Sequence, residues 1–208
     1  MKLAVLNGSP RGDWSNSIRM ARWVTKEAPV YNLDRAVRHE EVLEGIRSAE
    51  AYLIVIPLYV DSMPAQVKAF LELMEKNRDD FSGKRICYIV HSGFPEAIHS
   101  YNLRDYLEYY SELMDMDYLG TLIMAGSESL QMAPDKFFRK KMPFFKQVND
   151  SLLKGEKLPE GINRKMNRVE KHSPLGNMLY GLFPFKNWYW HHRAKQHGTK
   201  ESLRARPY

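Results

Sequence analysis

Short apolar runs alternate with helical patterns along the first three-quarters of this chain of 208 residues. The runs cover residues 3–7, 29–33, 51–56, 85–90 and 117–124. They are mostly continuous rather than alternating, which is typical of strands that are buried on both faces of a sheet. Longer segments with apolar residues at helical spacing separate them. This order predicts an α/β fold with a doubly wound, five-stranded parallel sheet.

The helical patterns cover residues 15–27, 39–48, 64–76, 101–114 and 135–154. Pro64 falls in the first turn of its helix, where proline is tolerated. Pro143 falls inside the last pattern and predicts a bent or split helix. Ligands of doubly wound sheets bind at the carboxyl ends of the strands, near the switch in strand order. The loops expected to carry function are therefore residues 8–16, 57–63 and 91–98.

The net charge of +6 is unevenly distributed. Residues 155–208 contain 11 Lys and Arg against 4 Asp and Glu, whereas residues 1–154 contain 20 against 21. We therefore expect a near-neutral domain over residues 1–154 and a basic, aromatic C-terminal extension over residues 155–208. A chain whose globular part is not basic is not expected to bind nucleic acid.

The extension is also rich in large apolar side chains, of which residues 175–190 contain ten. Exposing so many is unfavourable. We expect this segment to pack on the domain or on a partner subunit, in a homodimer or a higher homo-oligomer. Contact of the tail with a membrane is the less favoured alternative, because Pro184 interrupts any long amphipathic helix there.

A cytoplasmic location is expected from what the sequence lacks. No stretch approaches the ~18 consecutive apolar residues of a membrane span, and the first residues do not follow the signal-peptide pattern. The single cysteine, Cys87, excludes an intramolecular disulfide and a multi-cysteine metal site. It lies in an apolar run, so a buried, unreactive thiol is expected.

The loop after the first apolar run reads NGSPRGDWSNS. A glycine- and hydroxyl-rich turn that leads into a helix suits a phosphate, because backbone N–H groups and the helix dipole point at the anion. The candidate donors are Ser9, Arg11, Ser15, Asn16 and Ser17. Neither of the two commonest nucleotide-binding glycine motifs is present. Taken alone, the loop could equally be a helix cap followed by surface residues.

Three loops together resemble the flavodoxin-like NAD(P)H-dependent FMN reductases, the multimeric-flavodoxin group related to the quinone reductases. They read NGSPRGDWSNS, PLYVDSMPAQVKAFLE and HSGFPEA, and the resemblance covers roughly residues 1–150. It implies the strand order 2-1-3-4-5, FMN as cofactor and NAD(P)H as co-substrate. It also implies that the first loop holds the FMN phosphate, and that two other loops flank the flavin ring through Pro57, Leu58, Tyr59, Val60, Ser62 and Met63, and through Ser92, Gly93 and Phe94.

No catalytic side chain and no metal site is predicted. A flavin carries the hydride chemistry itself, and the protein supplies position and electrostatics. The segment AGSESL lacks the second glycine of a nucleophile elbow. Adjacent histidines, such as His191 and His192, point in different directions on a helix and do not favour a metal site. His91 and His99 flank the third of the three loops, where a structural role is expected.

The implied function is an oxidoreductase that passes hydride from NAD(P)H through FMN to a quinone, a flavin or a similar aromatic acceptor. One alternative is a flavodoxin-type electron carrier without turnover of its own. Such carriers are usually strongly acidic, and residues 1–154 are not. Another alternative is a flavin-free scaffold whose basic tail binds a membrane or nucleic acid.

Overall fold

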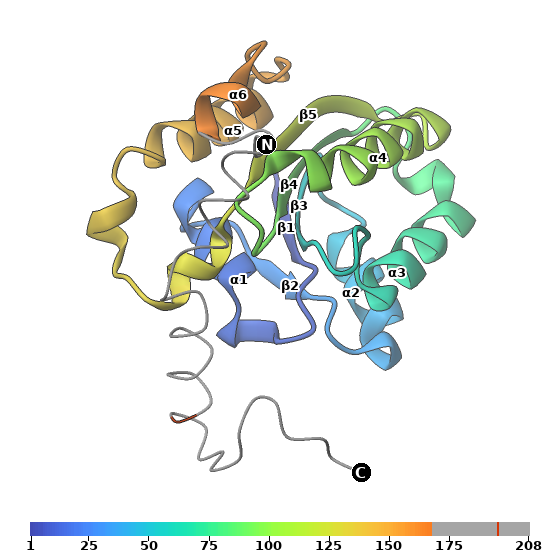
Figure 1. Ribbon diagram of the computed structural model, residues 1–208. Helices are drawn as coiled ribbons and strands as arrows, with labels where there is room; N and C mark the ends of the chain where they lie inside the picture. Colours follow the sequence, from blue (N-terminus) through green and yellow to red (C-terminus); the bar gives the residue numbers. More distant parts are fainter. Residues whose placement is uncertain (168–194, 196–208) are drawn as a thin grey trace. The chain divides into compact units, whose positions relative to one another are not determined.

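The chain folds around one parallel sheet in the computed structural model, which describes residues 1–167 and Lys195. The strands are β1 (Leu3–Asn7), β2 (Val30–Asn32), β3 (Ala51–Pro57), β4 (Arg85–His91) and β5 (Asp117–Met124). Their order is β2-β1-β3-β4-β5. The predicted five-stranded, doubly wound sheet of order 2-1-3-4-5 is confirmed (Figure 1).

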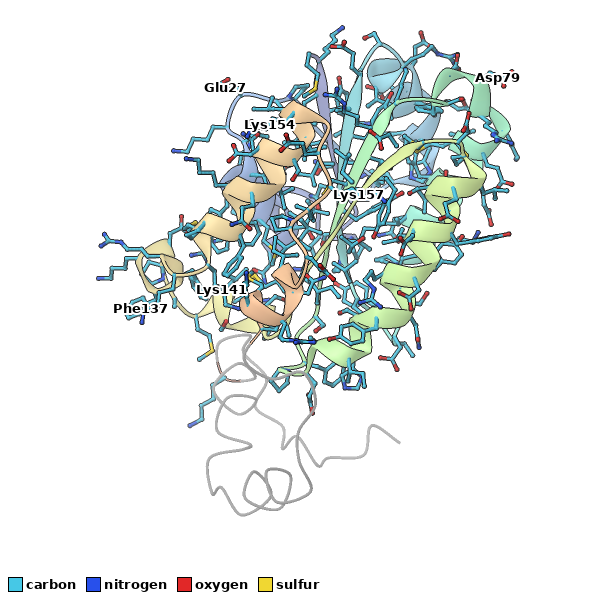
Figure 2. All side chains as sticks on the ribbon, turned by 90° about the horizontal axis from the view of Figure 1, so that it is seen from above. Glu27, Asp79, Phe137, Lys141, Lys154 and Lys157 are labelled. Carbon is cyan, nitrogen blue, oxygen red and sulfur yellow. The ribbon has the colours of Figure 1, made fainter. Side chains whose placement is uncertain are left out.

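Helices cover both faces of the sheet: α1 (Asn16–Val24) and α5 (Met142–Lys154) lie on one side, and α2 (His39–Ile46), α3 (Ala65–Lys76) and α4 (Tyr101–Leu113) on the other (Figure 1). All seven residues of β3 are buried. Alternate strand residues therefore contribute to two separate apolar cores. Charged residues such as Glu27, Asp79 and Lys154 point outward at the periphery (Figure 2).

The segment expected as a bent or split helix over residues 135–154 is split. A 3₁₀ turn covers Asp135–Phe138, and α5 begins at Met142 with Pro143 in its first turn. The missing N–H of proline costs nothing there, because the first-turn N–H groups of a helix have no intrahelical partner. Pro143 therefore starts a helix rather than bending one.

A short helix that the sequence patterns did not predict, α6 (Ile162–Met166), packs beside the edge strand β5. The Asn163 side chain accepts a hydrogen bond from Ile123 N (2.7 Å) and donates one to Thr121 O (2.9 Å). Asn167 repeats this arrangement one helical turn later with Ala125 N and Ile123 O, both at 2.9 Å. The two amides pair with the edge backbone as a sixth strand would, which protects this part of the edge.

The remaining expectations for the extension concern residues 168–208, which apart from Lys195 lie outside the described residues. Residues 155–167, which the sequence division assigns to the extension, contact β5: Leu158 N donates to Leu119 O at 2.7 Å. Among the residues that the structure describes, no helix has the length and apolarity needed to cross a membrane.

Candidate functional site

The first loop leaves β1 through a glycine that has no room for a side chain. A Cβ on Gly8 would lie 2.8 Å from Val67 Cγ2 and 3.0 Å from Val55 O. The Asn7 side chain then holds the loop from inside, since it donates to Gly12 O (2.9 Å) and accepts from Ser9 N (3.1 Å). The tight turn brings the loop over the carboxyl end of the sheet.

Helix α1 begins at the end of this loop with a serine cap. Ser15 Oγ accepts from Ile18 N at 3.3 Å. The N–H groups of Asn16 and Ser17 stand in the first turn, where a helix offers no internal acceptor. Arg11 is exposed, and its guanidinium has no hydrogen-bond or ion-pair partner within residues 1–167. The loop therefore offers a cation beside a helix N-terminus, a combination that favours an anion.

The loop after β3 contains two left-handed residues, Val60 (φ +50°) and Asp61 (φ +57°). This conformation is unusual for a β-branched residue such as valine. Tyr59 and Ser62 pair across the turn through N–H···O bonds of 2.8 and 3.1 Å. The turn leaves Tyr59 45% and Val60 97% exposed.

The loop after β4 presents a second exposed ring, Phe94, which is 55% exposed. Its ring centroid lies 4.8 Å from that of His99, whose Nδ1 is 3.3 Å from Asp61 Oδ1. Ser92 is buried and donates its hydroxyl to Phe94 O at 3.2 Å. The loops after β3 and β4 are thus joined through His99.

The loop after β5 also reaches the site, through a 3₁₀ turn at Ser127–Gln131. Ser127 N donates to Ser92 O at 2.8 Å, and Asn16 Nδ2 donates to Ser127 O at 2.9 Å. Arg19 of α1 binds the carbonyl oxygens of Leu130 and Ala133. These bonds fasten the 3₁₀ turn against the start of α1.

A small cavity of about 60 Å³ lies where these loops meet. Seven residues that the sequence proposed for the site line it: Ser9, Arg11, Asn16, Pro57, Leu58, Tyr59 and Gly93. The other seven lie outside its wall. Ser15 and Ser17 are buried in α1 and its cap, Ser92 is buried below the loop, Met63 packs against the core, and Val60, Ser62 and Phe94 are exposed nearby.

The cavity wall also contains four residues that the sequence analysis did not assign to the site: His91, Ser127, Glu128 and Gln131. His91 ends β4, and its ring lies between Ser17 Oγ (2.8 Å from Nε2) and Ser127 Oγ (3.0 Å from Nδ1). Burial lowers the pKa of His91 to about 3, so the ring is neutral at physiological pH. The sequence showed a histidine next to the loop proposed after the fourth strand. It could not show the two partners of that histidine, because Ser17 and Ser127 lie 74 and 36 residues away.

Metal chemistry finds no support in residues 1–167, where no group of three or more His, Cys, Asp and Glu residues is placed to hold an ion. Cys87 is buried as expected, and burial raises the pKa of its thiol to about 12. It is therefore neither a nucleophile nor a ligand.

The fold defines a flavodoxin-like α/β protein, and the candidate site lies at the carboxyl edge of its sheet. The family model of the NADPH-dependent FMN reductases matches residues 30–127. The resemblance drawn from the three loops is thereby confirmed. The matched region includes the loops after β3 and β4, whereas the opening loop precedes it. A search of curated proteins finds no match.

Solved structures with the same fold include an NADPH-quinone reductase from P. pentosaceus, at 18% identity and a TM-score of 0.58, covering 72% of this chain and 98% of that one. The general stress protein 14 from Treponema denticola, solved in complex with FMN, has 15% identity, a TM-score of 0.58 and coverages of 73% and 99%. An NADH:FMN oxidoreductase in its apo form has 15% identity, a TM-score of 0.56 and coverages of 78% and 93%. Likenesses at these identities establish the fold alone.

Proposed function

We propose that this chain binds FMN and works as an NAD(P)H-dependent reductase of a quinone, a flavin or a similar aromatic acceptor. One observation carries the proposal. A cavity at the carboxyl edge of the sheet, whose wall includes the donors Ser9, Arg11 and Ser127 together with the carboxylate of Glu128, lies beside two exposed aromatic rings in a chain that matches the FMN reductase family.

The cavity fits the phosphate end of FMN. Pockets for drug-sized ligands measure roughly 300–1,000 Å³, so about 60 Å³ accepts a small group and not a three-ring flavin. Arg11 supplies a positive charge, and Ser9 supplies a buried hydroxyl. Two expected donors already have protein partners, because Asn16 Nδ2 binds Ser127 O and Ser17 Oγ binds His91. The backbone N–H groups of Asn16 and Ser17, at the start of α1, are therefore better candidates for holding the phosphate than their side chains.

The flavin ring would lie outside the cavity, between the loop of Tyr59 and the loop of Phe94. Both rings are about half exposed, so each already presents apolar surface to a ligand and does not have to leave the core to do so. A ring held between two surface loops keeps an edge or a face open to a stacked partner, which reaction at about 3–3.5 Å requires. When bound, FMN accepts a hydride from NAD(P)H and passes it to the acceptor.

The residues of this chain would bind and orient, and none is proposed to transfer a proton. His91 is buried and neutral. His99 Nδ1 lies 3.3 Å from Asp61 Oδ1, and the His99 ring contacts that of Phe94 at a tilt of 35°. Protons that the acceptor needs can come from water, because both loops are at the surface.

A turnover enzyme is favoured over an electron carrier. Carriers of the flavodoxin type are recognised by their partners through a strong negative charge. Residues 1–154 have no such charge, because they contain 20 Lys and Arg against 21 Asp and Glu. We also propose that the chain forms a homo-oligomer and is located in the cytoplasm. Either NADPH or NADH is proposed as the hydride donor.

Steady-state kinetics tests the proposed function. The purified full chain, supplied with FMN, NADPH or NADH and an excess of a soluble quinone, should oxidise the nucleotide catalytically. Ping-pong kinetics are expected, because both substrates use the same face of one flavin. A protein that holds FMN but is reduced by neither nucleotide contradicts the reductase and favours the carrier.

A further inference from the structure

The buried imidazole of His91 connects three parts of the candidate site. Its Nε2 lies 2.8 Å from Ser17 Oγ, in the first turn of α1. Its Nδ1 lies 3.0 Å from Ser127 Oγ, in the 3₁₀ turn after β5. His91 itself ends β4 and, with Ser127, forms part of the cavity wall beside Ser9 and Arg11.

A neutral imidazole has one N–H donor and one acceptor nitrogen. One serine must therefore donate its hydroxyl hydrogen to the ring, and the other must accept the ring N–H. The accepting serine keeps its own hydrogen for another partner. The tautomer of His91 thus decides which of Ser17 and Ser127 remains a donor.

The surroundings of the two serines select the tautomer. Ser17 is fully buried, and in the part of the chain that the structure describes its hydroxyl has no hydrogen-bond partner other than His91. A buried hydroxyl without an acceptor costs about 1–3 kcal/mol. Ser127 is also buried and has His91 as its sole hydroxyl partner among the described residues, but it lines the cavity, where water or a ligand can accept its hydrogen. Ser17 therefore donates to Nε2. The ring proton then sits on Nδ1 and is donated to Ser127.

We propose that His91 is a positioning residue, which as its Nδ1–H tautomer leaves the Ser127 hydroxyl free to donate to a phosphate monoester in the cavity. Ser127 would then be an additional phosphate ligand, contributed by the loop after the fifth strand. The inference rests on the proposed function, since the phosphate in question is that of FMN. It goes further by assigning roles to two residues outside the first loop.

Paired titrations with FMN and riboflavin test the inference, because the two flavins share the ring and differ in the phosphate. Flavin fluorescence reports both affinities for the full chain. Ser127→Ala should weaken FMN binding by about tenfold, the effect of losing one hydrogen bond to a charged group. Riboflavin binding should not change. Ser129→Ala, in the same 3₁₀ turn and exposed, is the matched control and should affect neither flavin.

Two substitutions of His91 separate its two contacts. The amide of His91→Asn falls near the position of Nδ1 and can still donate to Ser127, so FMN affinity should be largely retained. The amide of His91→Gln reaches toward Ser17 and leaves Ser127 without its donor, so FMN affinity should fall while riboflavin affinity is kept. A role limited to stability would instead lower both affinities together in both variants.

Nitrogen-15 NMR of the histidine ring, in the full chain without flavin, reads the tautomer directly. The inference requires a neutral ring protonated at Nδ1. A ring protonated at Nε2, or unchanged FMN affinity in both Ser127→Ala and His91→Gln, overturns the inference alone. Failure of the wild-type chain to bind FMN contradicts the proposed function first, and it is seen before any variant is made.

Discussion

The proposed preference for FMN over riboflavin depends on single residues at the carboxyl edge of the sheet. Arg11 is an exposed cation in the wall of the cavity, without a partner in residues 1–167. Removing it should weaken FMN binding more than riboflavin binding, by roughly tenfold or more, because hydrogen bonds to charged groups contribute about 1.5–3 kcal/mol.

Comparing Arg11→Ala with Arg22→Ala by flavin titration checks this prediction. Arg22 lies in the last turn of α1, so Arg22→Ala removes an equal charge farther from the cavity. Equal FMN affinities of the two variants would contradict the assignment of the first loop to the phosphate. Ser9→Ala is expected to act in the same direction, without adding fully to Arg11→Ala, since both belong to one network.

Val60 shows strain in the loop that would flank the flavin. Its φ of +50° is unfavourable for a β-branched residue, and its side chain is 97% exposed, so it gains little from packing. We expect Val60→Gly to leave the free energy of unfolding unchanged or to raise it by up to about 1 kcal/mol. Urea denaturation measures the change.

Val37 provides the matched control, since it is 91% exposed and has an ordinary negative φ. Val37→Gly should lower the free energy of unfolding, because glycine gains more conformational freedom in the unfolded chain. If the two variants are destabilised alike, the left-handed conformation of Val60 is not a source of strain.

At the scale of elements, the edge strand β5 depends on α6. The amides of Asn163 and Asn167 pair with three backbone groups of that strand and with the N–H of Ala125, the residue after it. Asn163→Ala and Asn167→Ala should each lower the free energy of unfolding by about 1–3 kcal/mol, because they leave backbone groups of β5 without partners. Lys165→Ala, an exposed change in the same helix, should cost less than about 0.5 kcal/mol. Equal losses in all three variants would show that the amides do not support the edge.

The elements with long or strongly apolar patterns could be predicted from the sequence. The predicted strand 117–124 coincides with β5, and the predicted helix 64–76 differs from α3 by one residue. By contrast, α6 has only five residues, too few for a periodic pattern, and its role comes from two asparagines that meet a strand about 40 residues earlier. The split at Pro143 was one of the two predicted outcomes, and the first-turn position of the proline explains why the helix begins there.

The candidate site could be predicted only in part, because a sequence pattern reports local structure and not contacts between distant segments. Local signals, namely the glycine turn and the donors around Arg11, indicated the first loop. The role proposed for His91 and Ser127 depends on contacts between β4, α1 and the loop after β5, which no local sequence pattern predicts. Ser17 was proposed as a phosphate donor, and its side chain is instead occupied by His91.

At the scale of the whole molecule, a parallel sheet brings the loops that follow β1, β3, β4 and β5 to one edge. Hydrogen bonds join the loop after β5 to Ser92, which follows β4, and to the start of α1. The apolar rings that remain exposed there are the surfaces on which a planar cofactor would gain most. The proposed function therefore requires that a flavin binds at this edge.

Titration of the purified chain with FMN, followed by flavin fluorescence and visible absorption, tests whether a flavin binds here. We expect saturable binding of one FMN per chain, with a shifted flavin absorption band and weaker binding of riboflavin. A fluorescence signal that stays proportional to added FMN, without saturation or spectral shift, would contradict it.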